Sequence, residues 1–296
     1  MRLSTVIYHL LSEHLSDDAS EWLNAKMALL EKGKEKDLFF SFSSAPRMVG
    51  KKTLTISAEQ TKVLKMLGTG IEWQHLTVDT ISRWLMLVSY PSHDESHYHA
   101  VLSKLFSTAD MEEQIALYKA LPLLPHPHKF RFQATEGIRS NIKGVFEAVA
   151  LDNPFPQQQM DESAWNQLVL KAFFIGSPLY RIKGLDERAN SALARMLVDF
   201  AHERWAAGRS VNPELWRLVG PFLDLKVFED LYKLYHSHNS DDRIAAALAC
   251  AQSTLPEARQ LLEKDMKLCD AIERGKLNWD IFSRQLYAEE FEELQP

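Results

Sequence analysis

The chain has 296 residues, 46% of them hydrophobic and 25% charged, which is typical of a globular protein that buries a large core. Its formal net charge of −6 provides no overall basic field that would attract nucleic acid or anionic lipid. Its two cysteines are too few for the disulfide framework of a secreted domain, and no apolar run approaches the roughly 20 residues of a membrane span. We therefore expect a cytoplasmic protein without nucleic-acid partners.

The first 75 residues contain helix start signals on either side of an irregular segment. Ser16 is a good N-cap for one amphipathic helix, and Ser57 with Gln60 three residues later has the sequence of a capping box for another. Between these helices, residues 37–55 combine a serine-rich run with Pro46. Because a lone strand would be unstable, we predict that residues 37–55 form an ordered loop.

Apolar residues recur with helical spacing through residues 76–285, and short loops separate the helical patterns. Ser92 is the expected cap of one helix, residues 131–151 predict a longer helix, and residues 241–253 with 256–267 predict an antiparallel pair. No strand signals lie between these patterns. We therefore predict an all-α fold of stacked antiparallel helix pairs, similar to an α-solenoid or α-α superhelix.

A chain of 296 residues could form one elongated domain or two compact ones. We expect one elongated domain, residues 1–296, with an N-terminal part at 1–75 and a helical-repeat part at 76–285. The repeat is inferred from helix lengths and loop spacing, because no self-similarity at a fixed period is present. Stacked helix pairs of this kind offer extended surfaces for binding other proteins.

Residues 164–175 predict the most strongly apolar helix, which Asp161 caps and Gly176 ends. One side of this helix is continuously apolar from Trp165 to Phe173, while Leu170 and Phe174 project from nearly the opposite side. A helix that is apolar on two sides packs between neighbours, so we predict that it is central. Asn190 is the expected cap of the following helix, and Asn212 precedes a third helix with Pro213 at its first position.

Histidines near residue 95 raise the question of a metal site. His93 and His97 would stand one turn apart on a helix, a spacing that can hold a metal ion. The zincin motif, however, requires glutamate directly after the first histidine, and Asp94 occupies that position. A third ligand would have to come from elsewhere in the chain. A solvated polar turn is the simpler interpretation, and we expect no cofactor.

Several polar residues are candidates for binding a ligand or a partner. Arg47 and Lys51 flank Gly50, where backbone N–H groups could cradle a phosphate or carboxylate. Other candidates lie beside the apolar helix or before the next one: Asp152, Asn153, Asn166, Gln167, Lys171 and Asp186. The structural alternative is that these residues cap turns, satisfy backbone groups or pair as surface charges. Trp165, Trp205 and Trp216 are expected in the core rather than stacked on a ligand.

Four segments together resemble the EboA-domain family. They are Asp-Asn-Pro-Phe-Pro at 152–156, Ala-Trp-Asn-Gln-Leu-Val-Leu-Lys-Ala at 164–172, Gly-Leu-Asp-Glu-Arg-Ala-Asn at 184–190 and Pro-Glu-Leu-Trp-Arg at 213–217. The segment 42–51, from Phe42 to Lys51, is similar to the N-terminal signature of the family. The motifs match in order and spacing, but they are not catalytic motifs.

The resemblance implies a bacterial protein encoded in a gene cluster that moves a small secondary metabolite, or its precursor, towards the periplasm. Such clusters also encode a UbiA-type membrane prenyltransferase, a sugar-phosphate-cyclase-like protein and TIM-barrel-like hydrolases or isomerases. The resemblance therefore implies partner proteins from the same pathway and a place near the membrane through those partners. It carries over signature positions but no catalytic or binding residues.

Three functions follow from these observations, and we favour the first. It is a non-catalytic cytoplasmic scaffold or adaptor in the biosynthesis and traffic of a secondary metabolite. The second is a small-molecule carrier or sensor, in which the helix 164–175 borders a cavity and Lys171, Asn166 or Arg47 orients a polar head group. The third is a metal-assisted enzyme that uses His93 and His97.

Overall fold

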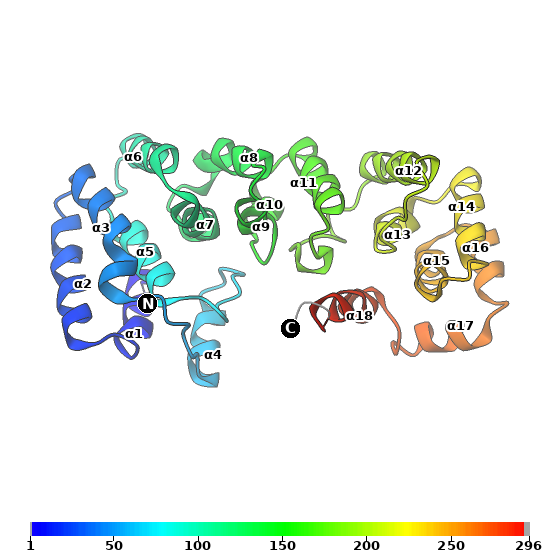
Figure 1. The fold of residues 1–296 in the computed structure, drawn as a ribbon, viewed down its shortest axis with the longest axis horizontal. Helices are drawn as coiled ribbons and strands as arrows, with labels where there is room; N and C mark the ends of the chain where they lie inside the picture. The colour runs from blue at the N-terminus through cyan, green and yellow to red at the C-terminus, as the bar shows by residue number, and fades with distance from the viewer. Residues whose placement is uncertain (1, 293–296) are drawn as a thin grey trace. The chain divides into compact units, whose positions relative to one another are not determined.

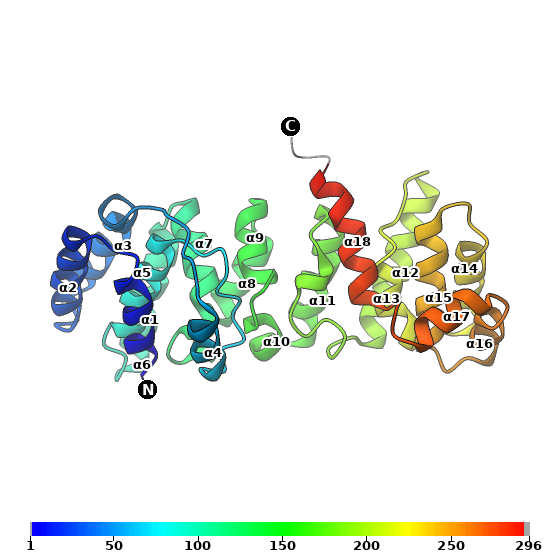
Figure 2. The same ribbon diagram turned by 90° about the horizontal axis from the view of Figure 1, so that it is seen from below.

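The computed structural model describes the backbone of residues 2–292 and the side chains of residues 2–288. Along these residues helices follow one another, and the strand pairing is limited to a single β-bridge between Thr53 and Thr77 (Figures 1 and 2). The all-α prediction is therefore confirmed. Residue contacts group the chain into a first unit, Met1–Asp161, and a second unit, Glu162–Pro296. The predictions of one elongated domain and of a solenoid along the whole chain stay predictions.

The first unit is organised around α5 (Val78–Ser89), which is buried on all sides and packs against α1, α2, α3 and α7 (Figure 1). Ser57 and Gln60 form the predicted capping box, and Ser16 caps its helix as predicted. The remaining helices of this unit are α1 (Leu3–Ser12), α2 (Asp17–Leu30), α3 (Glu35–Val49), α4 (Ala58–Met66), α6 (Glu95–Thr108), α7 (Met111–Ala120), α8 (Arg131–Arg139), α9 (Lys143–Ala150) and α10 (Phe155–Gln159), with 3₁₀ turns η1 (Leu121–Leu123) and η2 (Pro127–Phe130).

The prediction of a loop at residues 37–55 is wrong, because α3 continues to Val49. Proline at position 46 cannot donate the helical hydrogen bond to the carbonyl of Phe42, four residues earlier. In the structure Arg83 of α5 compensates, since its Nε donates to the Phe42 oxygen at 3.0 Å and its guanidinium lies over the Phe42 ring. Asp79, one turn earlier on α5, holds the buried Arg83 through an ion pair of 3.5 Å. A contact between helices thus replaces the hydrogen bond that proline removes.

The predicted helix 131–151 is divided into α8 and α9 by a break at residues 140–142. The break lets the chain turn back, so that α9 packs closely on both α8 and α7. Gly137 lies at the tightest point, where an added Cβ would stand 2.6 Å from Val149 Cγ2 and 2.7 Å from Tyr118 Cε1. A continuous helix would separate these surfaces, so the packing of Gly137 gives a reason for the break.

We expect Gly137→Ala to lower the free energy of unfolding by about 1–3 kcal/mol, because the new methyl group overpacks a buried contact. Gly144→Ala on α9 is the matched control, since its Cβ would meet only the Ile115 Cδ1 atom at 3.3 Å. The control should be neutral or more stable by up to about 1 kcal/mol through the higher helix propensity of alanine. Urea titration followed by circular dichroism measures both, and equal stability of the two variants would contradict the close packing.

The second unit is organised around α15 (Ser240–Gln252), whose small residues are buried from Ala245 to Cys250. This helix packs against α13, α14, α16 and α17 (Figures 1 and 2). The remaining helices of the unit are α11 (Glu162–Ile175), α12 (Ser191–Ala206), α13 (Leu215–Val219), α14 (Leu225–Tyr235), α16 (Pro256–Leu262), α17 (Met266–Glu273) and α18 (Trp279–Glu292), with 3₁₀ turns η3 (Leu179–Arg181) and η4 (Gly220–Phe222).

The helix that the sequence placed at the centre, α11, buries only part of its apolar surface. The predicted stripe from Trp165 to Phe173 is buried, but Phe174 is 75% exposed, so the expectation that it buries a second face is wrong. Within the second unit the alanine-rich α15 is surrounded instead, because its small side chains let neighbouring helices approach closely. The predicted pair 241–253 and 256–267 corresponds to α15 and α16, although α16 ends at Leu262.

Candidate functional site

The predicted site residue Asn166 forms an amide pair with the predicted cap Asn190 inside the second unit. Asn166 on α11 and Asn190 before α12 exchange hydrogen bonds, with Asn190 Nδ2 donating to Asn166 Oδ1 at 2.9 Å and Asn166 Nδ2 donating to Asn190 Oδ1 at 3.3 Å. Asn190 Oδ1 also accepts from the backbone N–H of Leu193 at 2.9 Å, which confirms the predicted cap. The Asn166 amide therefore joins α11 to the start of α12.

Asn153 has a similar structural role in the first unit. Its Nδ2 donates to the carbonyls of Tyr118 at 3.0 Å and Ala148 at 2.9 Å, and its Oδ1 accepts from the backbone N–H of Phe155 at 3.0 Å. The buried side chain thus satisfies backbone groups from three places in the chain. Asp152 beside it is half-buried and has a positive φ of 53°, a backbone region that aspartate tolerates at turns.

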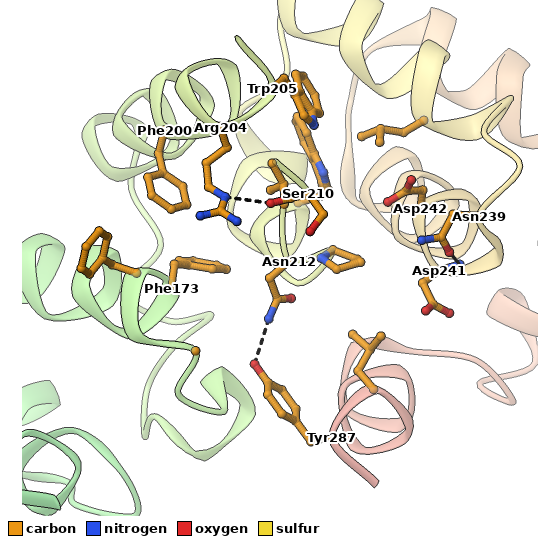
Figure 3. A pocket seen from close by; sticks show the side chains of 17 residues that line it. Phe173, Phe200, Arg204, Trp205, Ser210, Asn212, Asn239, Asp241, Asp242 and Tyr287 are labelled. Carbon is orange, nitrogen blue, oxygen red and sulfur yellow. Dashed lines mark hydrogen bonds between the residues drawn. The ribbon is translucent and has the colours of Figure 1, made fainter. Parts of the chain in front are cut away.

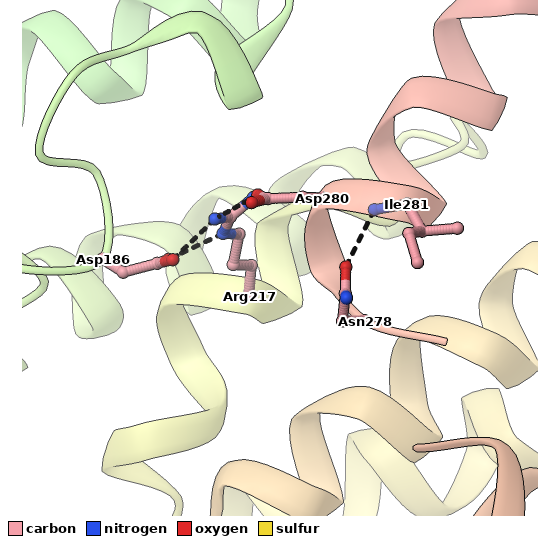
Figure 4. Close-up of polar contacts among 5 residues, drawn as sticks. All are labelled: Asp186, Arg217, Asn278, Asp280 and Ile281. Atoms are coloured by element: carbon pink, nitrogen blue, oxygen red, sulfur yellow. Dashed lines mark hydrogen bonds and ion pairs between the residues drawn. The ribbon is translucent and has the colours of Figure 1, made fainter. Parts of the chain in front are cut away.

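Asp186 belongs to an ion-pair cluster that sequence reasoning did not assemble (Figure 4). Arg217 Nε donates to Asp186 Oδ1 at 2.6 Å, and Arg217 Nη2 also donates to Asp280 Oδ1 of α18 at 2.8 Å. The arginine side chain is only 7% exposed, whereas the carboxylates are 50% and 68% exposed. Burial alone would lower the pKa of Arg217, but hydrogen bonds and attraction from both aspartates raise it above its ordinary value.

Glu214, one turn before Arg217, is a buried carboxyl group with only 1% of its surface exposed. Burial raises its pKa, and the Ser283 and Tyr287 hydroxyls, the Arg217 charge and the Leu179 backbone oppose that effect by less. Among the described residues neither carboxylate oxygen of Glu214 has a hydrogen bond of ordinary geometry. The nearby hydroxyls of Ser283 and Tyr287 both belong to α18. Glu214 thus lies beside α18, and the ion pair of Arg217 with Asp280 is the contact that attaches this segment to that helix.

The other predicted binding residues are dispersed. Arg47 and Lys51 are exposed at the C-terminal end of α3, where helix carbonyls rather than N–H groups are available. Gln167 is exposed on α11, while Lys171 on the same helix is half-buried, and burial lowers its pKa. A role for these four side chains in binding a ligand or a partner stays a prediction.

The prediction that His93 and His97 share a helix is wrong. Asp94 is the N-cap of α6, because its Oδ1 accepts from the backbone N–H of His97 at 3.0 Å, so the helix begins at Glu95 and not after Ser92. His93 therefore precedes the helix. In the part of the chain that the structure describes, no group of three or more histidine, cysteine, aspartate or glutamate side chains could hold a metal ion.

A pocket of about 500 Å³ lies in the second unit, a volume within the usual range for small-molecule sites (Figure 3). Trp205 and Trp216 stack with ring centroids 5.9 Å apart on one side of it. Trp216 is buried, as the sequence predicted for these tryptophans, whereas Trp205 is half-buried. The other lining residues are Phe173, Phe174, Gly176, Phe200, Arg204, Ser210, Val211, Asn212, Pro213, Leu234, Asn239, Asp241, Asp242, Leu286 and Tyr287.

The family model described as metabolite traffic protein EboA matches residues 3–220. The chain belongs to the EboA family. No curated protein and no solved structure matches the chain. Among the described residues, every helix is too short or too polar to cross a bilayer.

The match to the EboA family ends within η4, but several residues that line the pocket come later in the chain. The side formed by Phe173, Phe200 and Arg204 lies inside the matched residues, whereas the side formed by Asp242 and Tyr287 lies outside them. The anchor of α18 likewise joins matched and unmatched parts of the chain, as in the Arg217–Asp280 ion pair. The EboA segment of this chain thus meets later helices at the ion-pair cluster and at the pocket.

Proposed function

We propose that this EboA-family protein is a non-catalytic adaptor in metabolite traffic that binds other proteins of its pathway. The proposal rests on the contacts that residues of the family's signature segments form within the protein. Asn153, Asn166, Asp186 and Arg217 form hydrogen bonds and ion pairs that hold helices and turns together. Signature positions that specify the shape of a helical protein are what an adaptor requires, since an adaptor acts through its surfaces.

The adaptor would act in the cytoplasm with the products of a bacterial secondary-metabolite cluster, including a UbiA-type membrane prenyltransferase that would bring it to the membrane. Exposed apolar side chains are the contact points that this role requires. Both units have exposed apolar side chains. Those with the highest exposed fractions are Phe40, Met66 and Phe132 in the first unit and Phe174, Leu225 and Met266 in the second.

Affinity purification of the tagged protein from a host that expresses the whole cluster tests the adaptor role. We expect at least one other cluster product to co-purify in stoichiometric amount. If the second unit contacts the partner, Phe174→Ser combined with Leu225→Ser should reduce recovery of the partner at least fivefold. If the first unit makes the contact, Phe40→Ser combined with Phe132→Ser should have this effect.

Glu162→Ser is the control, because it changes an exposed polar residue of α11, the helix that carries Phe174. The control should leave recovery unchanged. Recovery of no cluster product by the unaltered protein would contradict the adaptor role.

The pocket of the second unit favours a second function, that of a small-molecule carrier. As the carrier hypothesis expected, α11 borders the cavity, but it does so through Phe173 and Phe174. Lys171 and Asn166, which the hypothesis assigned to the ligand head group, do not line the pocket, and neither does Arg47. A carrier and an adaptor are compatible, since a protein that delivers a metabolite also contacts the protein that receives it.

A further inference from the structure

We infer that the pocket of the second unit binds an organic acid with a ring-containing apolar body, whose acidic group pairs with Arg204. This inference rests on the carrier function proposed above and is independent of the adaptor function. It follows from three features of the pocket: aromatic walls, an arginine held in place on one side, and aspartates on the other.

Part of the pocket wall is aromatic and suits a planar ring. Phe173 and Phe200 face the cavity from α11 and α12, and Trp205 lies on a further side (Figure 3). Trp216, which is almost fully buried, stacks on Trp205. Aromatic side chains stack on planar groups and contribute a large apolar surface. A cavity of about 500 Å³ has room for a molecule of two or three fused or linked rings.

Arg204 supplies the charged contact. Its Nε donates to the carbonyl of Ser210 at 2.7 Å, which fixes the guanidinium beside Phe200 at the edge of the pocket (Figure 3). Within the described residues its two Nη atoms form no ion pair or hydrogen bond, so their N–H donors can bind a ligand. A guanidinium held in this way presents paired donors that match a carboxylate, sulfonate or phosphate.

The opposite side limits the ligand to one acidic end. Asp241 and Asp242 lie there in the first turn of α15, and Ser237 Oγ donates to Asp242 Oδ2 at 3.0 Å. Burial raises the pKa of Asp242, with the Ser237 hydrogen bond opposing this and the Asp241 charge adding to it. A second anionic group placed beside these carboxylates would be repelled, whereas a hydroxyl or amine could donate to them.

Two fluorescent probes test the assignment. They are 8-anilino-1-naphthalenesulfonate, which has an aromatic body and one acidic group, and N-phenyl-1-naphthylamine, its neutral counterpart. We expect saturable binding of one equivalent of the sulfonate, detected by energy transfer from tryptophan. Arg204→Gln should raise the sulfonate Kd at least tenfold and the Kd of the neutral probe less than twofold. Asp241→Asn with Asp242→Asn should lower the sulfonate Kd and leave that of the neutral probe unchanged.

Arg195→Gln is the matched control, because Arg195 is exposed on the same helix and does not line the pocket. It should leave both Kd values unchanged. Arg204→Lys keeps the charge and should recover part of the sulfonate affinity, and a thermal melt of each variant shows that it is folded. If both probes bind and Arg204→Gln affects them equally, the acid assignment is overturned and the carrier function stands. If neither probe binds with one-to-one saturation, the assignment and the carrier function both fail.

Discussion

Replacing Asp186 and Asp280 together by asparagine is expected to lower the free energy of unfolding of the second unit by about 3–5 kcal/mol. The double replacement removes both ion-pair partners of the buried Arg217 guanidinium, whose own Nη1 atom already lacks a hydrogen bond. Each single replacement should cost less than half as much, because the other carboxylate remains. Arg217→Met should also cost less than the double variant, since it removes the buried charge itself and leaves carboxylates that water can reach.

Arg259→Gln provides the control for this prediction. Arg259 and Glu263 form an ion pair of 3.1 Å on α16 with both side chains exposed, and such pairs contribute about 0.5 kcal/mol or less. Urea titration gives the stabilities, and hydrogen exchange of α13 and α18 locates the change, because both helices carry residues of the cluster. A double variant that is no less stable than Arg259→Gln would show that the cluster does not anchor α18.

Features encoded within a few consecutive residues could be predicted from the sequence. The caps at Ser16, Ser57 and Asn190 are confirmed, because the side chain that accepts the hydrogen bond and the N–H that donates it lie within three residues. The apolar stripe of α11 is confirmed for the same reason, since helical periodicity alone places those side chains on one side. One wrong prediction, the loop at residues 37–55, concerns a segment whose structure depends on a residue far away in the sequence.

The helix α3 shows why. Its proline and serines favour a loop when they are read locally, and the helix is stabilised by Arg83, which lies 41 residues beyond the carbonyl it binds. The prediction for His93 is wrong for a different reason. Ser92 and Asp94 are both acceptable caps, and because Asp94 is the actual cap, His93 lies before the helix. Periodicity could not distinguish these two starting points.

The pocket could not be found by reading along the chain, because its walls come from six helices and the loop before α13. A partial signal was present in the sequence: Arg204 and Trp205 stand at the end of an amphipathic helix, directly before a polar loop. The sequence also directed attention to the polar residues of the family motifs. The structure shows Asn153, Asn166 and Asp186 in contacts that join helices and turns, whereas the roles of Gln167 and Lys171 stay predictions.

Glu214→Gln is expected to make the protein more stable at neutral pH, with a gain that depends on pH. Because burial raises the pKa of Glu214 in the folded state, the folded protein binds this proton more tightly than the unfolded chain. The stability of the unaltered protein should therefore fall as pH rises from the ordinary glutamate pKa, about 4.3, to the raised value. Glutamine has the shape of the protonated side chain without the titration, so the variant should not show this loss.

The difference in free energy of unfolding between Glu214→Gln and the unaltered protein should be smallest near pH 4 and grow by at most about 1.4 kcal/mol for each pH unit. Urea titrations between pH 4 and pH 8 measure it. Glu257→Gln, which removes the same charge from an exposed position on α16, reports the effect of net charge alone. A constant loss of stability in Glu214→Gln across this range would mean that the carboxylate is stabilised as an anion by Ser283, Tyr287 and Arg217. The buried acid would then strengthen the attachment of α18 instead of weakening it at neutral pH.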